Sequence, residues 1–429
     1  MHSAISARGT GRDRSRRFRT ERVRVRSSSV AARSMGSSRG GSRSRARLLR
    51  DPPGAYNQRA NRRRSAMKAV VTRELNQYSV EDVRLDPPKA GELRIKMGAT
   101  GVCHSDLSVI NGTLPLPRPM VLGHEGAGVV AEIGAGVTGF AVGDHVVLSF
   151  APACGVCTFC KSKQPQFCSV GGPHGRMLDG TARMHDKSGA DLGVMQFLGC
   201  MSEEVIVPAI SACVIDKSIP LDKAALVGCG VMTGVGAAIN TARVTPGSSV
   251  AVFGCGGVGL SIIQGARLAG AAKIIAVDVA DKKLEMARHF GATHTVNGSK
   301  ESSVMKCKEF TGGLGPDFTF EAVGIPQLMM EAHAAGRRGA TTTIVGVGKI
   351  TEQVPFNGLM LSMEGKTIKG SFYGDTNFRS DFPMLLDLYT GGKLNLDDMV
   401  SATYSIVDAP RAIQDLEKGV NARGVIVYR

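Results

Sequence analysis

The chain has 429 residues, 53 of them basic and 37 acidic, but its formal net charge of +16 is confined to one end. Residues 1–66 contain 19 Arg and three acidic residues, which leaves 34 basic and 34 acidic residues in the remainder. A neutral body argues against a nucleic-acid-binding fold, because such a fold carries a basic patch on the folded domain.

Residues 1–66 are rich in Arg, Ser and Gly and have almost no apolar periodicity, so we predict a disordered tail there. Three interpretations compete: an arm that touches anionic polymers, an Arg- and Ser-rich transit peptide, and upstream sequence translated from a start codon set too early. We favour the third, because the strand-like run 67–71 and the neutral charge balance begin together. The N-terminal mass of protein from the native source distinguishes them, since a mature chain that begins near Met67 leaves the tail without a function.

The body of roughly 360 residues is long enough for two domains. We find no apolar run of the roughly 18–20 residues that a membrane span needs and no secretory signal, so we expect a cytoplasmic protein without a membrane partner. Ten cysteines, several of them closely spaced, indicate metal ligation in a reducing compartment rather than disulfides.

The first part of the body, residues 67–150, predicts a compact, mostly-β domain with functional loops. Residues 93–97 alternate apolar and polar side chains, as a half-buried strand does, and residues 143–147 are typical of a turn that leads into another strand. Glycine and proline are frequent, and helical periodicity is scarce.

The most unusual stretch of this domain is the pair His124-Glu125, which glycines enclose. An imidazole is a good zinc ligand, and a carboxylate stands beside it. A lone histidine is more often a satisfied core residue, but Cys103 and Cys229 add two thiolates. Together the three side chains form the cysteine–histidine set of a catalytic zinc with an open fourth position. This prediction requires that residues far apart in the chain meet in space.

A cluster of four cysteines follows the β region. Three lie at a spacing of three and the fourth comes after a short loop: Cys154, Cys157, Cys160 and Cys168. Such a cluster can surround one metal ion tetrahedrally and leaves no position open, so we predict a structural zinc. The main alternative is an iron–sulfur cluster, but the bacterial ferredoxin run has a shorter final gap and a proline after its last cysteine. Here a serine follows Cys168.

A nucleotide-binding fingerprint begins after a short apolar strand at 249–253. Its glycines are Gly254, Gly256, Gly257 and Gly259, and a helix to residue 269 and a second strand at 273–278 follow. The first glycine permits a tight turn, the second lets the backbone approach a pyrophosphate, and the last lets the helix pack close to the strand. Asp278 ends the second strand and can accept hydrogen bonds from the ribose hydroxyls of NAD. Because it would repel the 2′-phosphate of NADP, we predict a preference for NAD.

Alternating strands and helices continue from this point and predict a parallel, doubly wound sheet. We place a catalytic β domain with its zinc lobe at 67–229 and a Rossmann NAD-binding domain at 230–368. Residues 369–429 are expected to return to the catalytic domain.

The body resembles the zinc-dependent medium-chain alcohol dehydrogenases, most closely their bacterial alcohol and formaldehyde dehydrogenase branch. The motifs at 103–106, 123–125, 154–168 and 254–259 occur in the order of that family. The resemblance covers residues 67–429 and implies an α/β fold, with a GroES-like, mostly-β catalytic domain and a doubly wound Rossmann coenzyme domain. It also implies two zinc ions per chain, NAD as the cofactor, a small alcohol or aldehyde substrate, and a homodimer or homotetramer.

The resemblance also implies roles for individual residues. Cys103, His124 and Cys229 would hold the catalytic zinc, Glu125 could exchange onto the metal, and Asp106 would orient His124. Zinc would lower the pKa of the alcohol, and the alkoxide carbon would give hydride to the nicotinamide. Further matches are Ser105 as the group that takes the hydroxyl proton, His104 and Arg423 at the pyrophosphate, Lys283 at the adenosine ribose, Thr233 beside the nicotinamide, and Phe150 in the substrate pocket.

One position departs from the family pattern. Many relatives carry a histidine three residues beyond the Ser or Thr, as the outer end of a proton relay, and this chain has Ser108 there. We therefore predict a pH dependence that no histidine at this position sets.

Three functions remain open. The leading hypothesis is an NAD-dependent dehydrogenase of primary alcohols or their aldehydes. The second is a thiol-dependent formaldehyde dehydrogenase that oxidises a hydroxymethyl-thiol adduct. The third is a zinc- and nucleotide-binding module with a basic arm for nucleic acid, which the neutral body disfavours.

Overall fold

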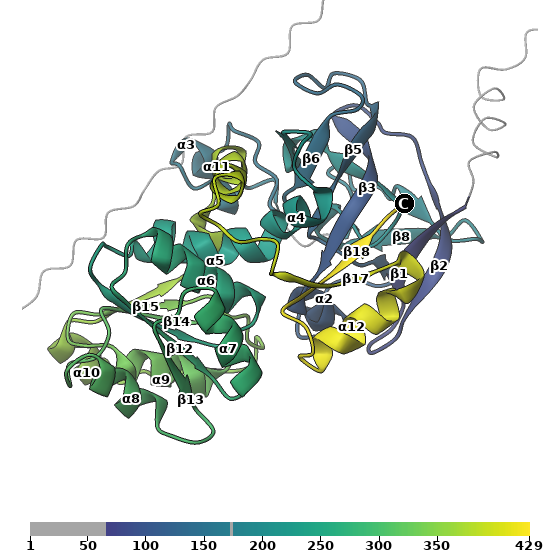
Figure 1. The fold of residues 1–429 in the computed structure, drawn as a ribbon. Coiled ribbons are helices and arrows are strands. Elements are labelled where there is room, and N and C mark those ends of the chain that lie inside the picture. The colour runs from purple at the N-terminus through teal and green to yellow at the C-terminus, as the bar shows by residue number, and fades with distance from the viewer. Residues whose placement is uncertain (1–65, 172–174) are drawn as a thin grey trace, which may run out of the picture. The chain divides into compact units, whose positions relative to one another are not determined.

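The computed structural model describes residues 66–171 and 175–429 (Figure 1). The predicted tail lies outside the described residues except for its last residue, so its three interpretations remain predictions.

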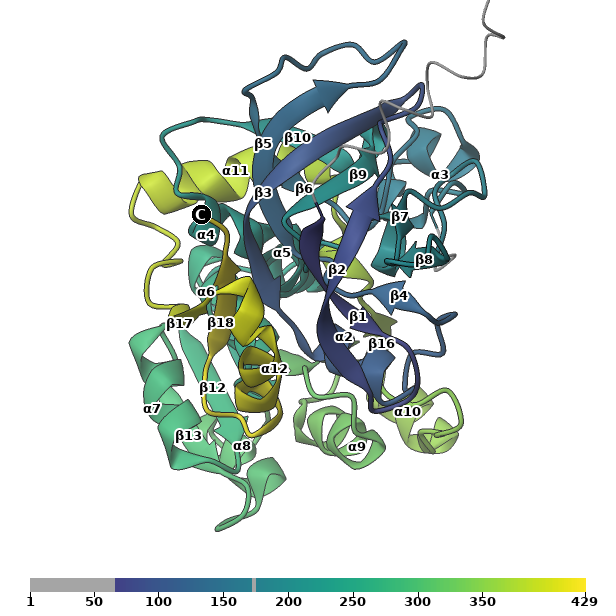
Figure 2. The same ribbon diagram turned by 90° about the vertical axis from the view of Figure 1, so that its right-hand side faces the viewer.

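The first domain is built from β-strands, as predicted. Strands in the order β1-β2-β7-β8-β4 close into a barrel, and beside it lies a sheet with the order β10-β6-β5-β3-β18-β17, in which β9 also pairs with β3 (Figure 2). The strand bounds are Met67–Thr72 (β1), Tyr78–Leu85 (β2), Glu92–Val102 (β3), Met120–Val121 (β4), Gly126–Ile133 (β5), His145–Leu148 (β6), Met184–His185 (β7), Asp191–Val194 (β8), Glu204–Pro208 (β9), Ala212–Ile215 (β10), Val400–Tyr404 (β17) and Arg423–Val427 (β18). The last two strands, β17 and β18, come from the C-terminal segment and lie beside β3 in this sheet.

The second domain is a parallel sheet with the strand order β13-β12-β11-β14-β15-β16. Its strands are Ser249–Phe253 (β11), Lys273–Asp278 (β12), His294–Asn297 (β13), Phe318–Glu321 (β14), Thr341–Ile344 (β15) and Thr367–Gly370 (β16). The helices of this domain are Gly257–Leu268 (α6), Asp281–His289 (α7), Ser303–Phe310 (α8), Pro326–Ala335 (α9) and Gly358–Glu364 (α10). The predicted α/β fold with a doubly wound sheet is confirmed.

The central strand β11 shows why the sequence predicted the strands of this domain. Residues 250–253 are fully buried, and residues of β12 and β14 flank them in parallel register. Strands covered on both faces become continuous apolar runs instead of alternating ones. The following helix α6 buries Leu260, Ile262 and Ile263 against the sheet.

A long helical run connects the two domains. It comprises α4 (Leu221–Leu226), a π-helical segment (Val227–Val231), α5 (Met232–Gly236) and a second π-helical segment (Ala237–Ala242). The run Leu221–Ala242 is long and apolar enough to cross a membrane, so the prediction that no run reaches this length is wrong. However, 83% of its apolar window is buried inside the protein, as in a core helix.

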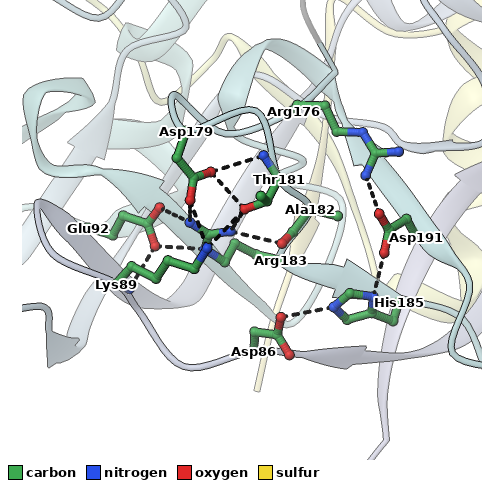
Figure 3. Close-up of polar contacts among 10 residues, drawn as sticks. All are labelled: Asp86, Lys89, Glu92, Arg176, Asp179, Thr181, Ala182, Arg183, His185 and Asp191. Carbon is green, nitrogen blue, oxygen red and sulfur yellow. Dashed lines mark hydrogen bonds and ion pairs between the residues drawn. The ribbon is translucent and has the colours of Figure 1, made fainter.

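A buried ion pair fastens the hairpin β7–β8 to the sheet (Figure 3). The guanidinium of Arg183 donates to both carboxylate oxygens of Glu92, at 2.9 and 2.6 Å, and to Asp179 at 2.9 Å. In the same hairpin, His185 lies between Asp86 and Asp191, with nitrogen–oxygen distances of 2.9 and 3.1 Å. Because a buried charge is costly without partners, removing Arg183 should be destabilising, since it leaves the buried carboxylate of Glu92 without its cationic partner, whereas Arg183 without Glu92 would still contact Asp179.

Candidate active site

Three predicted metal ligands converge in the structure. The sulfurs of Cys103 and Cys229 and a ring nitrogen of His124 lie within 4.8 Å of one another, and all three residues are buried. Cys103 follows β3 and precedes helix α2 (His104–Ile110), His124 lies between β4 and β5, and Cys229 lies in the first π-helical segment. Such interruptions of the α-helical pattern are frequent at functional sites.

Glycines around His124 allow this convergence. Gly123 has a φ of +95°, and a Cβ there would overlap the backbone of Met201. A Cβ on Gly126 would lie 2.6 Å from the sulfur of Cys200. The glycines therefore let the loop lie directly against the 200–201 segment, which holds the imidazole in place.

Asp106 connects two of the three ligands. Its carboxylate accepts hydrogen bonds from the backbone N–H groups of Cys103, at 2.9 Å, and Gly123, at 3.1 Å. The same carboxylate lies 3.3 Å from Nδ1 of His124. This contact is the one predicted for Asp106, and it leaves Nε2 as the nitrogen that can bind metal.

The Nε2 atom of His124 is buried and has no hydrogen-bond partner among the described residues. An unpaired polar atom is costly in a protein interior, so this nitrogen and the two sulfurs fit a zinc ion. Burial opposes the charged imidazolium, but Asp106 and then Cys103 outweigh it and raise the pKa of His124 to about 10. The pKa of Cys103 lies well below its usual range, mainly because the thiol of Cys229 donates to it. The nearby His124 and Arg423 contribute smaller effects in the same direction. Because zinc binds a neutral imidazole and thiolates, metal and protons compete for these three side chains, which makes metal binding pH-dependent.

Glu125 lies beside this centre but is held elsewhere. One carboxylate oxygen accepts a hydrogen bond from the backbone N–H of Gly230 at 3.0 Å, and the other forms an ion pair with Arg423. A Cβ on Gly101 would overlap this carboxylate, so a glycine is required there. Exchange of Glu125 onto the metal remains a prediction.

Arg423 joins the metal centre to the nucleotide fingerprint. It begins β18 and is buried, and a Cβ on Gly257 would lie 2.5 Å from its Cδ. Its side chain thus runs between Glu125 and the first turn of α6. The pKa of His104 is lowered, chiefly because burial removes solvent from the imidazole and also because the cations Arg423 and Lys283 lie nearby. The negative charge of Cys103 opposes this shift. Two of the residues predicted to contact the phosphates and ribose, Arg423 and Lys283, are therefore close enough to the third, His104, to affect its charge.

The fingerprint has the backbone geometry that its glycines predict. Gly254 has a φ of +96°, and a Cβ on Gly259 would overlap the carbonyl oxygen of Gly254. Within the described chain, a Cβ on Gly256 would meet nothing within 4 Å, so this glycine faces open space at the N-terminus of α6. Helix N-termini favour anions, and this one suits a pyrophosphate.

Asp278 stands at the end of β12, beside the fingerprint. Its carboxylate accepts hydrogen bonds from the backbone N–H groups of Cys255, at 2.8 Å, Val279, at 2.8 Å, and Ala280, at 3.1 Å. These contacts fix the carboxylate at the carboxyl edge of the sheet, where dinucleotides bind.

The remaining predicted residues lie close to the centre. Ser105 is half-buried in the first turn of α2, and its Oγ lies 3.9 Å from the sulfur of Cys103. Thr233 follows Cys229 by about one helical turn, and its side chain partly offsets the rise in the pKa of that thiol, which the neighbouring Cys103 and burial cause. Ser108 lies one turn beyond Ser105 on the same helix.

The four-cysteine lobe forms a second metal site. The sulfurs of Cys154, Cys157, Cys160 and Cys168 lie within 4.8 Å of one another. Backbone N–H groups point at them: Cys154 donates to Cys168 and Cys157 donates to Cys154, both at 3.3 Å. The N–H groups of Cys160 and Ser169 lower the pKa of Cys157 to about 5. These N–H groups favour the thiolate form of Cys157, which is the form that binds a metal ion.

Aromatic side chains form a row that begins at His124. The ring of Phe150 lies 5.8 Å from the imidazole and 6.1 Å from the ring of Phe372. Phe372 stacks on Phe167 at 5.8 Å, and Phe159 follows at 6.2 Å. Phe372, Phe167 and Phe159 are 47, 42 and 43% exposed, respectively. Of the four phenylalanines, the sequence identified only Phe150, although Phe159 and Phe167 directly precede the lobe cysteines Cys160 and Cys168.

Comparisons with known proteins agree with this geometry. Residues 89–217 match the family described as "Alcohol dehydrogenase GroES-like domain", and residues 257–391 match "Zinc-binding dehydrogenase". The chain is 40% identical over 367 residues to "Putative alcohol dehydrogenase D" of Mycobacterium tuberculosis, covering 84% of this chain and 99% of that protein. It is 41% identical over 360 residues to the "S-(hydroxymethyl)glutathione dehydrogenase" of Saccharomyces cerevisiae, covering 81% and 92%. The crystal structure of benzyl alcohol dehydrogenase from Acinetobacter calcoaceticus is similar, with a TM-score of 0.81 and 32% identity over 85% of this chain and 100% of that chain.

The chain therefore belongs to the zinc-dependent medium-chain alcohol dehydrogenase family, and the predicted resemblance is confirmed. It is an oxidoreductase with two zinc-site groups and an NAD(P)-binding Rossmann domain.

Proposed function

We propose that this enzyme oxidises primary alcohols that carry an aromatic or similarly bulky apolar group, with NAD as the hydride acceptor. The observation that supports this substrate class is the aromatic row from His124 to Phe159. Its exposed rings offer apolar and π surface to a substrate ring, and burying that ring is favourable by about 1.5–3 kcal/mol.

The same row argues against a hydroxymethyl-glutathione substrate. Its phenyl side chains carry no charge, and the segment that carries Phe372 also carries Asp375, which accepts a hydrogen bond from Gln166 at 3.2 Å. A glutathione adduct brings two carboxylates that these surroundings do not neutralise. The relative of similar identity from Saccharomyces cerevisiae nevertheless makes this adduct the second candidate.

The proposed reaction assigns a separate task to each group at the centre. When bound, zinc would polarise the substrate hydroxyl and nicotinamide would accept the hydride. Asp106 holds the imidazole of His124 through Nδ1, so that Nε2 would be available to a bound ion, and Ser105, beside Cys103, would relay the hydroxyl proton by accepting it while donating its own. Because Ser108 has no basic group, water carries that proton from the site.

The proposed preference for NAD depends on Asp278. Three backbone N–H groups orient its carboxylate, so it is placed to accept from ribose hydroxyls without rearrangement. A 2′-phosphate would be repelled by a charge that is held in place.

A substrate panel tests the proposal. We expect benzyl alcohol to exceed ethanol in kcat/KM by about ten- to a hundredfold, with NAD preferred over NADP and no requirement for a thiol. Phe372→Ala should reduce the preference for benzyl alcohol, whereas Leu359→Ala, at a residue 71% exposed elsewhere in the second domain, should not. Preferential oxidation of formaldehyde plus glutathione would instead establish the second candidate.

A further inference from the structure

A short segment that leaves the coenzyme sheet has unusual backbone geometry. Directly after β16, Tyr373, Gly374 and Asp375 have φ values of 59°, 65° and 49°. Side-chain-bearing residues rarely adopt this left-handed region, and they remain there only where the surroundings hold them. The contacts of the segment therefore show what it is held against.

The hydroxyl of Tyr373 contacts the backbone beside a metal ligand. It donates a hydrogen bond to the carbonyl oxygen of Gly228, the residue that precedes Cys229. Tyr373 is 2% exposed, and this polar contact joins the end of the coenzyme sheet to the π-helical segment 227–231.

The ring of Tyr373 reaches the other side of the same centre. Its centroid lies 4.0 Å from that of Phe150, whose ring in turn lies 5.8 Å from the imidazole of His124. One side chain thus contacts the backbone that carries Cys229 and the aromatic ring beside His124.

Neighbouring contacts leave the segment little freedom. The side chain of Asn240 donates to the carbonyl oxygen of Gly374 at 3.0 Å, and Gln166, next to the zinc lobe, donates to Asp375 at 3.2 Å. A Cβ on Gly236 would overlap the carbonyl of Gly374. The helical run and the lobe therefore hold Tyr373 from both sides.

A simpler interpretation is that Tyr373 only fills the core, because Phe382 also lies near its ring, at 6.5 Å. A phenylalanine would fill that volume equally well. The hydroxyl adds the bond to Gly228, and the two interpretations differ in what that bond does.

We propose that Tyr373 is a positioning residue for the catalytic metal centre: its hydroxyl fixes the backbone of residues 228–229 and so sets the position of the Cys229 sulfur. This inference rests on the proposed role of Cys229 as a zinc ligand. The hydrogen bond of Tyr373 thereby couples the end of the coenzyme sheet to the geometry of the metal site, on which hydride transfer depends.

The test compares Tyr373→Phe with Tyr389→Phe, which removes a hydroxyl that donates to Asp397 at 3.0 Å, far along the chain from any metal ligand. The catalytic zinc is replaced by Co²⁺, and the visible absorption of the cobalt–thiolate centre is recorded together with kcat and KM. We expect Tyr373→Phe to keep two metal ions per chain, to shift the cobalt band and to lower kcat about tenfold, with KM for NAD unchanged. Tyr389→Phe should match the wild type in all four readouts.

A cobalt band and kcat identical to those of the wild type in Tyr373→Phe would overturn the proposal, whatever the thermal midpoint of that variant. The variant Cys229→Ala distinguishes failure of the ligand assignment from failure of the positioning role. If that variant keeps the second metal ion, the ligand assignment fails; if it loses the ion while Tyr373→Phe has a normal cobalt band, only the positioning role fails.

Discussion

The two metal sites use similar donor atoms but are assembled in opposite ways. The lobe draws its four sulfurs from residues 154–168, and nearby backbone N–H groups hold them. The catalytic centre draws its three ligands from positions between 103 and 229, on three separate elements, and all are buried. The lobe can therefore form locally, whereas the catalytic centre exists only when the first domain and the connecting helical run have come together.

The groups that hold the ligands also differ between the two metal sites: backbone N–H groups in the lobe and charged side chains at the catalytic centre. The lobe sulfurs receive backbone N–H groups, which are the largest cause of the lowered pKa of Cys157. The catalytic ligands are held by ionised side chains: Asp106 beside His124, and the Glu125–Arg423 pair beside Cys229. A closed site needs only thiolates in place, whereas an open site that performs chemistry needs its charges oriented from several directions.

The largest effect should follow from removing a catalytic ligand. In Cys103→Ala we expect one of two zinc ions to be lost and turnover to fall by roughly 10³-fold or more, because the ion stabilises transition-state charge by several kcal/mol. Metal analysis and kcat measure both. Cys307→Ala, at a buried cysteine of the second domain outside both sites, is the control and should keep both ions. Full metal and activity in Cys103→Ala would show the ligand assignment to be wrong.

Removing a lobe ligand should affect stability first. In Cys154→Ala we expect one zinc ion to be lost and the thermal midpoint to fall by about 10 °C or more, because binding free energy at a structural site is folding free energy. Calorimetry measures the midpoint, and activity per folded molecule at low temperature measures the catalytic site. A variant that melts like the wild type would contradict a structural role for the lobe.

A smaller effect should come from the carboxylate that connects two catalytic ligands. Asp106→Asn keeps the size of the side chain but removes the charge beside His124, and we expect the affinity of the catalytic site for zinc to fall about 10- to 100-fold. Titration with a competing chelator measures this affinity, and the lobe zinc in the same protein is the internal control. An equal weakening of both ions would point to a general loss of folding instead.

The smallest effect concerns proton exit. Introducing a relay histidine as Ser108→His should add an ionisation near pH 6.5 to the kcat profile. The neutral imidazole accepts a proton and the charged one does not, so kcat should rise with pH through that value. The lobe plays no part in this step. An unchanged profile would show that the relay position is irrelevant in this enzyme.

The sequence predicted best those features whose residues are close together. The four-cysteine spacing identified the lobe, and the glycines between a strand and a helix identified the fingerprint, since each is determined by local backbone geometry. The convergence of Cys103, His124 and Cys229 needed the family resemblance, because no local pattern specifies that three distant elements meet.

Other features could not be predicted because they arise only from tertiary packing. The partners of Glu125 are Gly230 and Arg423, which lie over a hundred positions further along the chain. The aromatic row combines residues of the lobe with Phe372, which follows the edge strand β16. The Leu221–Ala242 run was underestimated because glycines and single polar residues interrupt its apolar pattern, although the whole run packs into the core.

X-ray diffraction from crystals of the enzyme, recorded at the zinc absorption edge, tests the central claim most directly. We expect two anomalous peaks per chain. One should lie in the lobe, and the other should lie about 2.3 Å from the sulfurs of Cys103 and Cys229 and about 2.0 Å from Nε2 of His124. A fully active preparation with a peak in the lobe and none between these three residues would contradict the account.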